Sequence, residues 1–250
     1  YTYDSQTKAP EEYIFTPSLK DITITGTTFN GGYMGLELRE TNNVTITDNV
    51  FNVGDRNILL ASNSGCTYSG KVTITGNVSN NAKERFVRMS GAGDAVVVIK
   101  DNYIYNYQGA DADYIKVTDG SNVTIENNVL MVTSAVDLQS RVNSAAKGLN
   151  EFGFANDITG NVTIPQNDKI NIVINGLGKK YDGTITVNGN QRSGGSETLV
   201  IKNINFEHSG SNLYFVEQNI AQNYPHNVIV EDCTFKGDGT NVICGIRYRQ

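Results

Sequence analysis

The sequence predicts an all-β fold, a right-handed parallel β-helix (a solenoid of stacked coils), with one short amphipathic helix near the middle of the chain. Three observations predict it: a recurring strand-and-corner pattern, asparagines spaced by about one coil, and a second set of strands at a similar phase. The composition agrees, because 25 glycines, 4 prolines and no tryptophan suit many short strands joined by tight turns.

The strand-and-corner pattern begins with alternating β-branched residues, which is typical of a half-buried strand. A Gly, Asn or Asp follows, and these residue types tolerate a positive φ, so the chain is expected to turn a corner there. Such internal repetition predicts a solenoid, because each coil buries its apolar face only against the next coil. The seven copies are Ile22–Phe29, Val44–Phe51, Val72–Ser79, Val97–Ile104, Val123–Leu130, Leu199–Phe206 and Val228–Phe235.

An asparagine follows the corner in four consecutive copies. These residues are Asn49, Asn77, Asn102 and Asn128, at intervals of 28, 25 and 26 residues. A segment of that length can travel once around a three-sided coil and return one strand spacing higher, roughly 4.8 Å. The four amides are therefore predicted to stack in a ladder that supplies its own hydrogen-bond partners.

A second strand is predicted in each of the first four coils, at Gly35–Arg39, Asn57–Ala61, Phe86–Ser90 and Tyr114–Thr118. In register, these strands place one apolar column and then another inside the solenoid. The first inward column is Leu36, Ile58, Val87 and Ile115, and the second is Leu38, Leu60, Met89 and Val117.

Residues 134–149 interrupt the pattern and predict a short amphipathic helix. Leu138, Val142, Ala145 and Leu149 keep helical spacing, with Ser134 or Asp137 as the cap and Gly148 as the end. Three parts follow: coils with the asparagine ladder at 1–134, a capping or linker helix at 135–150, and a second β-helix segment at 151–250. Two arrangements fit: the end of one module and the start of another, or one solenoid with an excursion at 134–160.

After the helix the predicted strands follow one another at shorter intervals. They are Asn161–Pro165, Ile170–Gly176 and Thr184–Gly189. The stretch 138–206 resembles the opening of bacterial β-helix surface modules, in which an amphipathic helix covers the end of the solenoid. Residues 20–130 resemble the repeats of the pectate-lyase-like superfamily of right-handed parallel β-helices. These resemblances imply the fold and leave the activity open, because lyases, hydrolases, phage spikes and adhesins share this solenoid.

Composition and motifs exclude several functions. With 20 basic and 26 acidic residues, and a net charge of −6, the chain is a poor match for nucleic acid or an anionic membrane surface. No apolar run is long enough to cross a bilayer, and no signal peptide is found at Tyr1. Cys233 and Cys244 could pair or be small buried hydrophobes, and each of the two histidines is expected in a turn or on the surface.

Templates for catalysis are missing from the sequence: it has no Gly-x-Ser-x-Gly elbow, no phosphate-binding glycine loop and no His-Glu-x-x-His. The signatures of polygalacturonase-like enzymes are missing as well. Asp111 and Asp113 are an i, i+2 pair that could point the same way and bind Ca²⁺, but they lie in a polar turn where solvated acids are common, so no metal and no cofactor is expected.

The best candidate surface is the outward side of the second strands. Its predicted outward column is Glu37, Leu59, Arg88 and Lys116, beside a column of Gly35, Asn57, Phe86 and Tyr114. Cations flanked by aromatic rings suit a sugar, since guanidinium pairs with a carboxylate and a ring stacks on a pyranose. Glu37, Phe86, Arg88, Tyr114 and Lys116 are thus the predicted ligand-binding residues.

These observations favour an exported, non-enzymatic β-helix module of a surface or adhesin-like protein that binds a polysaccharide or cell-surface glycan and adjoins further modules. The alternative is a polysaccharide lyase or glycoside hydrolase that uses Lys116 or Arg88 as base on an acidic glycan. A third hypothesis is a purely structural stalk. Each places the chain outside the cell or at its surface.

Overall fold

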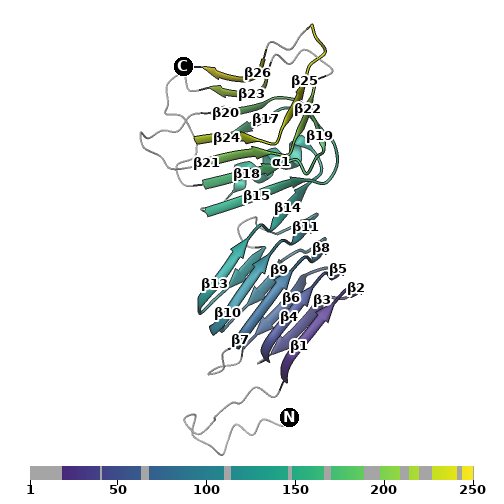
Figure 1. Cartoon of the computed structure of the whole chain (residues 1–250). Coiled ribbons are helices and arrows are strands. Elements are labelled where there is room, and N and C mark those ends of the chain that lie inside the picture. The colour runs from purple at the N-terminus through teal and green to yellow at the C-terminus, as the bar shows by residue number, and fades with distance from the viewer. Residues whose placement is uncertain are drawn as a thin grey trace, which may run out of the picture.

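The computed structural model shows a parallel β-solenoid whose coils stack from the N-terminal to the C-terminal end (Figure 1). In the part of the chain that the structure describes, the fold consists of five parallel sheets and one helix, which confirms the predicted class. The structure describes residues 19–39, 41–62, 68–109, 114–145, 148–165, 170–188, 198–208, 214–219, 227–240 and 244–249.

Three sheets form the first half. Sheet A, in spatial order, is β1 (Leu19–Thr25), β4 (Thr41–Thr47), β7 (Ser69–Thr75), β10 (Gly93–Lys100) and β13 (Gly120–Glu126). Sheet B begins with β2 (Thr28–Asn30), β5 (Val50–Asn52), β8 (Val78–Asn80), β11 (Tyr103–Tyr105) and β14 (Val129–Val132). Sheet C is β3 (Met34–Arg39), β6 (Arg56–Ala61), β9 (Arg85–Met89) and β12 (Ile115–Val117).

The core of the first half consists of the predicted apolar columns. Strand pairing places Leu36 beside Ile58, and Ile58 beside Val87. Ile58, Leu60, Val87 and Met89 are fully buried. The β-branched residues of sheet A line the opposite wall, where Val44, Ile46, Val72, Ile74, Val97 and Ile99 are also fully buried. Like residues therefore lie over like residues, as the repeat predicts.

Each predicted corner residue has a positive φ, between 50° at Asp232 and 68° at Gly76. The ladder of asparagines behind the corners is confirmed as well. Nδ2 of Asn49 donates to Oδ1 of Asn77 at 3.0 Å, Asn77 donates likewise to Asn102 at 3.0 Å, and Asn102 donates to Asn128 at 2.7 Å. All four side chains are buried, which is tolerable because each amide is hydrogen-bonded.

Helix α1 (Ala135–Ser144) follows β14 and confirms the predicted helix. The Ser134 hydroxyl caps it by accepting from the backbone N–H of Asp137 at 3.1 Å, and Leu138 and Val142 are buried. The predicted end at 149–150 is wrong. The helix stops at the Ala145 cap, and Leu149, 60% exposed, already lies in strand β15 (Gly148–Phe154).

The second half continues sheet B and adds two sheets. Sheet B runs on through β15, β18 (Ile170–Asn175), β21 (Thr198–Lys202) and β24 (Asn227–Glu231). Sheet D is β16 (Ile158–Thr159), β19 (Lys180–Asp182), β22 (Asn205–Glu207) and β25 (Thr234–Lys236). Sheet E is β17 (Val162–Ile164), β20 (Ile185–Asn188), β23 (Tyr214–Asn219) and β26 (Cys244–Arg249).

At helix α1 the copies of the repeat shift by one sheet, so that the same part of the motif lies in the next sheet around the solenoid. In the first half the longer strand of each copy lies in sheet A and the short strand after the corner lies in sheet B. In the last two copies the longer strands β21 and β24 lie in sheet B and the short strands lie in sheet D. The cause is α1, because the chain passes from β14 through the helix straight back to sheet B. Sheet B crosses the predicted division at 135–150 without a break, and the division into modules stays a prediction.

Candidate functional site

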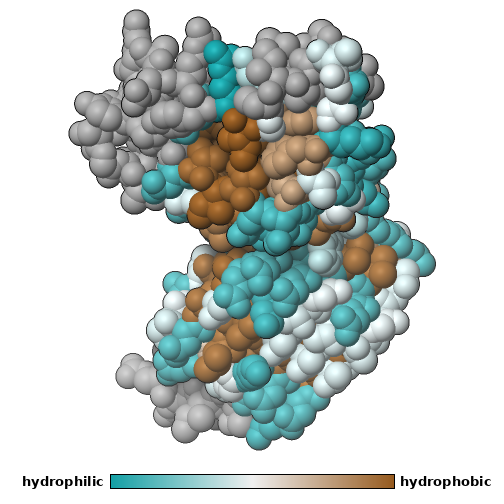
Figure 2. Space-filling model, turned by 45° about the horizontal axis from the view of Figure 1, so that its top comes forward, coloured by the Kyte–Doolittle hydropathy of each residue, from teal (hydrophilic) through white to brown (hydrophobic). Residues whose placement is uncertain are grey.

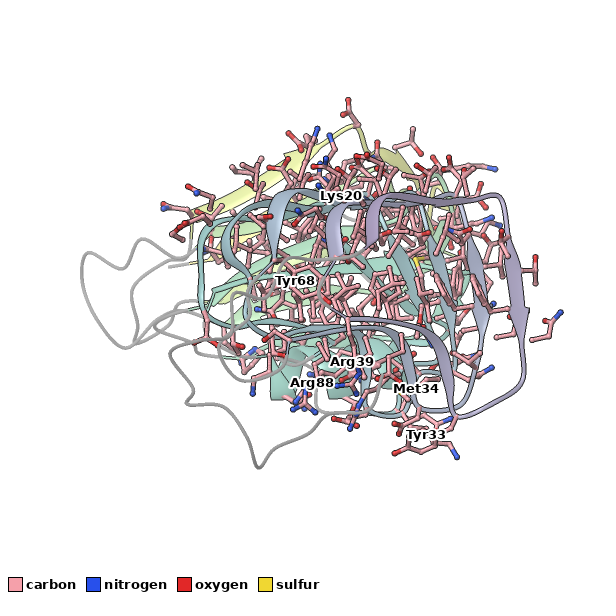
Figure 3. The ribbon with its side chains drawn as sticks, turned by 90° about the horizontal axis from the view of Figure 1, so that it is seen from below. Lys20, Tyr33, Met34, Arg39, Tyr68 and Arg88 are labelled. Carbon is pink, nitrogen blue, oxygen red and sulfur yellow. The ribbon has the colours of Figure 1, made fainter. Side chains whose placement is uncertain are left out.

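The outer face of sheet C carries the predicted outward column. Glu37 lies beside Leu59, Leu59 beside Arg88, and Arg88 beside Lys116, each pair on neighbouring parallel strands. Glu37, Arg88 and Lys116 are exposed, while Leu59 is only 8% exposed although it lies outside the main core. Seen along the solenoid, Arg39 and Arg88 project from this side, Lys20 lies on the opposite edge, and Tyr68 points into the core (Figure 3).

Ion pairs tie the cations of this face to neighbouring acids. Nε of Arg56 donates to Glu84 Oε2 at 2.5 Å, and Arg88 Nη1 lies 3.4 Å from the other oxygen of Glu84. The hydrogen bond from Arg56 lowers the pKa of Glu84 below its ordinary value and raises that of Arg56. Nε of Arg39 donates to Glu37 at 2.7 Å. Glu84 thus holds two guanidinium groups, from β6 and β9, in fixed positions.

Lys116 differs from the arginines, because it forms no ion pair with any residue that the structure describes. It lies at the end of sheet C, on the last strand, and its nearest cationic neighbour across the sheet is Arg88. Adjacent parallel strands are about 4.8 Å apart, so the two cations present a paired positive charge. Such a pair suits a ligand with carboxylate or sulfate groups.

The aromatic part of the prediction is wrong. Phe86 is fully buried, and Asn57 beside it in the column is fully buried too. The reason is the corner between sheets B and C, where strict alternation fails and two successive residues turn inward. At the start of the same column, a Cβ on Gly35 would lie 2.7 Å from the ring of Phe51, inside the core. Phe86 therefore packs in the core and presents no ring to a ligand.

Tyr114 also points inward. Its hydroxyl donates to the backbone carbonyl of Asn128 at 3.2 Å, and its ring meets Tyr107 edge to face. In the coils below, the carbonyl of each ladder asparagine accepts from the next coil, as Asn102 does from Val129 at 2.8 Å. Burial raises the pKa of Tyr114 to about 12, with the Glu151 carboxylate adding to the effect. Tyr114 is therefore a structural residue that completes the upper end of the ladder.

Three residues of this face were not predicted. Tyr33 is 66% exposed at the edge of the face, and its hydrogen bond to the Asp55 carboxylate raises its pKa. Arg39 and Arg56 add positive charge on β3 and β6. One signal was available in the sequence: Arg56 and Arg85 occupy the same phase in successive coils, and they pair in the register of sheet C.

The other candidate groups do not build a second site. Asp111, Asp113 and His226 lie outside the described residues, and among the described ones no cluster of His, Cys, Asp or Glu could hold a metal ion. His208, expected on the surface, is buried: it stacks on Phe215 and lies 3.3 Å from Asp182. Cys233 is a half-buried free thiol, so the alternative that pairs it with Cys244 is wrong.

No protein-family model, no curated protein and no solved structure matches this chain. Among the described residues, the single helix is far too short to span a bilayer.

Proposed function

We propose that the chain is a non-enzymatic β-helix module of an exported surface protein, and that it binds an acidic glycan along the outer face of sheet C. One observation carries the proposal. The four strands of sheet C hold five cations (Arg39, Arg56, Arg85, Arg88 and Lys116) and one carboxylate, Glu37; the turns before the strands add Asp55 and Glu84 beside Arg56 and Arg88, so the face keeps an excess of positive charge. The whole chain, by contrast, has a net charge of −6, so positive charge is concentrated on this face.

The geometry of the face supports an extended polymer as the ligand. Arg56, Arg88 and Lys116 lie on three successive strands spaced by about 4.8 Å; Arg88 and Lys116 are in register, whereas Arg56 is in register with Arg85. A chain of uronates or sulfated sugars laid across the strands would meet a cation at each coil. Guanidinium forms paired hydrogen bonds with carboxylate or sulfate, and Glu84 already holds two of the guanidinium groups in place.

The finer assignment, to the pectate-lyase-like superfamily and to bacterial surface modules that belong to a longer chain, is part of the same proposal. It is supported by the parallel solenoid and by the amphipathic helix that opens the second half. A surface module presents a long, regular face away from its attachment, and a solenoid provides one. Secretion or display at the cell surface follows from the proposed ligand.

The test is binding of the purified chain to uronate-containing and sulfated polysaccharides, with a neutral polysaccharide as reference. The variant Arg88→Gln/Lys116→Gln should lose at least about tenfold in affinity, because charge-assisted hydrogen bonds contribute about 1.5–3 kcal/mol each. The matched control, Lys71→Gln/Lys100→Gln, removes the same charge from sheet A and should bind as the parent does.

Equal loss in both variants would mean that net charge, and not this face, governs binding. If the chain binds no glycan, the third hypothesis, a purely structural stalk, is favoured. If the chain instead cleaves a uronate polymer with a new ultraviolet absorbance, and Lys116→Gln abolishes the cleavage, the chain is a lyase and the proposal is wrong.

A further inference from the structure

The two ends of the solenoid carry the same structural motif. The N-terminal coil consists of β1, β2 and β3, and the C-terminal coil consists of β24, β25 and β26. Both coils contain an eight-residue copy of the repeat, Ile22–Phe29 and Val228–Phe235, with the corner at Gly26 and at Asp232. In both, a three-residue strand follows the corner and the last strand has six residues.

Apolar residues at the C-terminal end lack the cover that the same positions have one coil below. Phe235 is 39% exposed, whereas Phe206 beneath it is fully buried. Ile246 is 51% exposed, whereas its neighbour Val216 is 1% exposed. Figure 2, in which this end comes forward, shows hydrophobic surface there.

The N-terminal end shows the same loss of cover. Ile22, Ile24 and Phe29 are half-buried, while Val44, Ile46 and Phe51 in the next coil are fully buried. Among the described strands, β1 is also the outermost strand of sheet A, as β24 is of sheet B. An exposed sheet edge is a template for pairing with another strand.

The side chains of the two ends match column by column. Phe235 stacks on Phe206 with ring centroids 5.1 Å apart and an interplanar angle of 10°. Phe29 stacks on Phe51 at 4.8 Å and 2°. A second copy placed on the C-terminal coil would put its Phe29 over Phe235 and continue one aromatic stack at the spacing of the coils. Its Ile22 and Ile24 would cover Val228 and Val230.

The corners match as well. Within the chain, Gly76 lies over Asp48, and a Cβ on Gly76 would meet Asp48 Oδ1 at 2.4 Å, so this position has room for the carboxylate only because it is glycine. A second copy would place Gly26 over Asp232 in the same order. The join therefore avoids carboxylate over carboxylate at the corner and reproduces an arrangement that the chain already uses.

The backbone pattern extends in the same way. Inside the solenoid, Gly26 N–H donates to the Thr47 carbonyl at 3.2 Å, and Val50 N–H donates to the Thr27 carbonyl at 2.9 Å. Across the join, the equivalent bonds run from Asp232 N–H to the Thr25 carbonyl of the second copy, and from that copy's Thr28 N–H to the Cys233 carbonyl.

We propose that copies of this chain bind head to tail, the N-terminal coil of one on the C-terminal coil of the next, with β1 on β24, β2 on β25 and β3 on β26. The two surfaces in contact are different, so the interface is heterologous and leaves a free end after every addition. The assembly is an open chain of copies, and its mean length rises with concentration.

The experiment uses two variants that each block one end: Ile24→Lys at the N-terminal coil and Val230→Lys at the C-terminal coil. Sedimentation velocity of the parent should show a mean mass that rises with protein concentration. Each variant alone should stay at the mass of the single chain at every concentration. An equimolar mixture of the variants retains one intact pair of ends, so it should form dimers of twice the single-chain mass and nothing larger.

The control variant is Ile125→Lys, which replaces an exposed apolar residue (46% exposed) in β13, away from both ends, and should assemble as the parent does. Circular dichroism and the unfolding midpoint show that each variant is folded. A parent that stays a single chain at high concentration overturns the proposal. So does a mixture of folded variants that forms no dimer, or an Ile125→Lys variant that loses assembly, since the latter indicates non-specific apolar aggregation.

Discussion

At the scale of single residues, the asparagine ladder concentrates many hydrogen bonds in the interior of the first half. Oδ1 of Asn102 accepts from the amide and the backbone N–H of Asn77, and the two hydrogens of its Nδ2 are shared among Asn128 Oδ1 and the carbonyls of Ile74 and Lys100. All of these partners lie in or against the core, where water does not replace a lost partner.

The substitution Asn102→Ala is expected to lower the free energy of unfolding by about 4 kcal/mol, because it leaves several buried polar groups unpaired at once. Urea denaturation measures the loss. A matched control exists on the outside of sheet B, where Asn52 donates to Asn30 at 2.8 Å and accepts from Asn80 at 2.7 Å in an exposed row. Asn52→Ala should change the stability by no more than about 0.5 kcal/mol, since water takes over its bonds. Equal losses in the two variants would contradict a special role of burial.

Tyr114 makes the folding stability depend on pH in the alkaline range. Burial raises the pKa of its phenol to about 12 in the folded chain, against about 10 in the unfolded chain. The contribution of the neutral phenol to folding stability is therefore complete below pH 10 and is lost as the pH rises from about 10 to about 12, by up to about 3 kcal/mol.

Tyr114→Phe keeps the ring and removes both the titration and the bond to the Asn128 carbonyl. The variant should be about 1 kcal/mol less stable than the parent near pH 8, and the gap should close and then reverse between pH 10 and pH 12. Unfolding curves across this range measure the gap, with Tyr103→Phe on the outer face of sheet B as control. A gap that stays constant would show that Tyr114 does not titrate as described.

Where the repeat is regular, the sequence predicted the positions of most individual side chains correctly. The corner residues, the ladder and the inward columns follow from residue type and spacing alone. It failed for Phe86 and Tyr114, because alternation within a strand says nothing about the residue at a corner. Which way that residue turns depends on the space inside the folded coil, which is a three-dimensional property.

At the scale of elements, helix α1 covers an open strand edge. The Gln139 side chain accepts from the backbone N–H of Thr163 at 2.7 Å and donates to the carbonyl of the same residue at 2.8 Å. Thr163 lies in β17, the first strand of sheet E, which has no strand beneath it in that sheet. The amide of Gln139 thus takes the place of a neighbouring strand.

We expect Gln139→Ala to cost about 1–2 kcal/mol, because both hydrogen bonds to the edge of β17 are lost. Hydrogen exchange of the Thr163 amide should become faster than in the parent. Val136→Ala, at a helix position that is 81% exposed, is the matched control and should leave both the stability and the exchange nearly unchanged. Unaltered protection of Thr163 in Gln139→Ala would show that another group covers this edge.

The start of this helix was predictable and its end was not. Ser134 is a strong cap and begins the helix as expected. Leu149 keeps the helical spacing but pairs with Asn171 in sheet B instead. Tertiary pairing therefore decides between helix and strand here, and a local apolar pattern does not contain that information.

At the scale of the whole molecule, the repeats predicted a solenoid but not how its halves join. Copies of one motif lie in sheets A and B before α1 and in sheets B and D after it. No single copy records that shift, because the motif itself is unchanged. The candidate face could be predicted only in part. The outward column of cations follows from the register of the strands, but the ion pairs around Glu84 involve a turn, whose conformation the repeat does not specify.

The narrow pairing between β14 and β15 has a mechanical consequence. Sheets A and C end below this point and sheets D and E begin above it, so sheet B is the one sheet shared by the two halves among the described residues. Only three residue pairs join the strands there, Leu130–Phe152, Met131–Gly153 and Val132–Phe154. Helix α1 packs against both β14 and β17 and so bridges the same point, and the short strip together with the helix sets the direction in which the cationic face points relative to the second half.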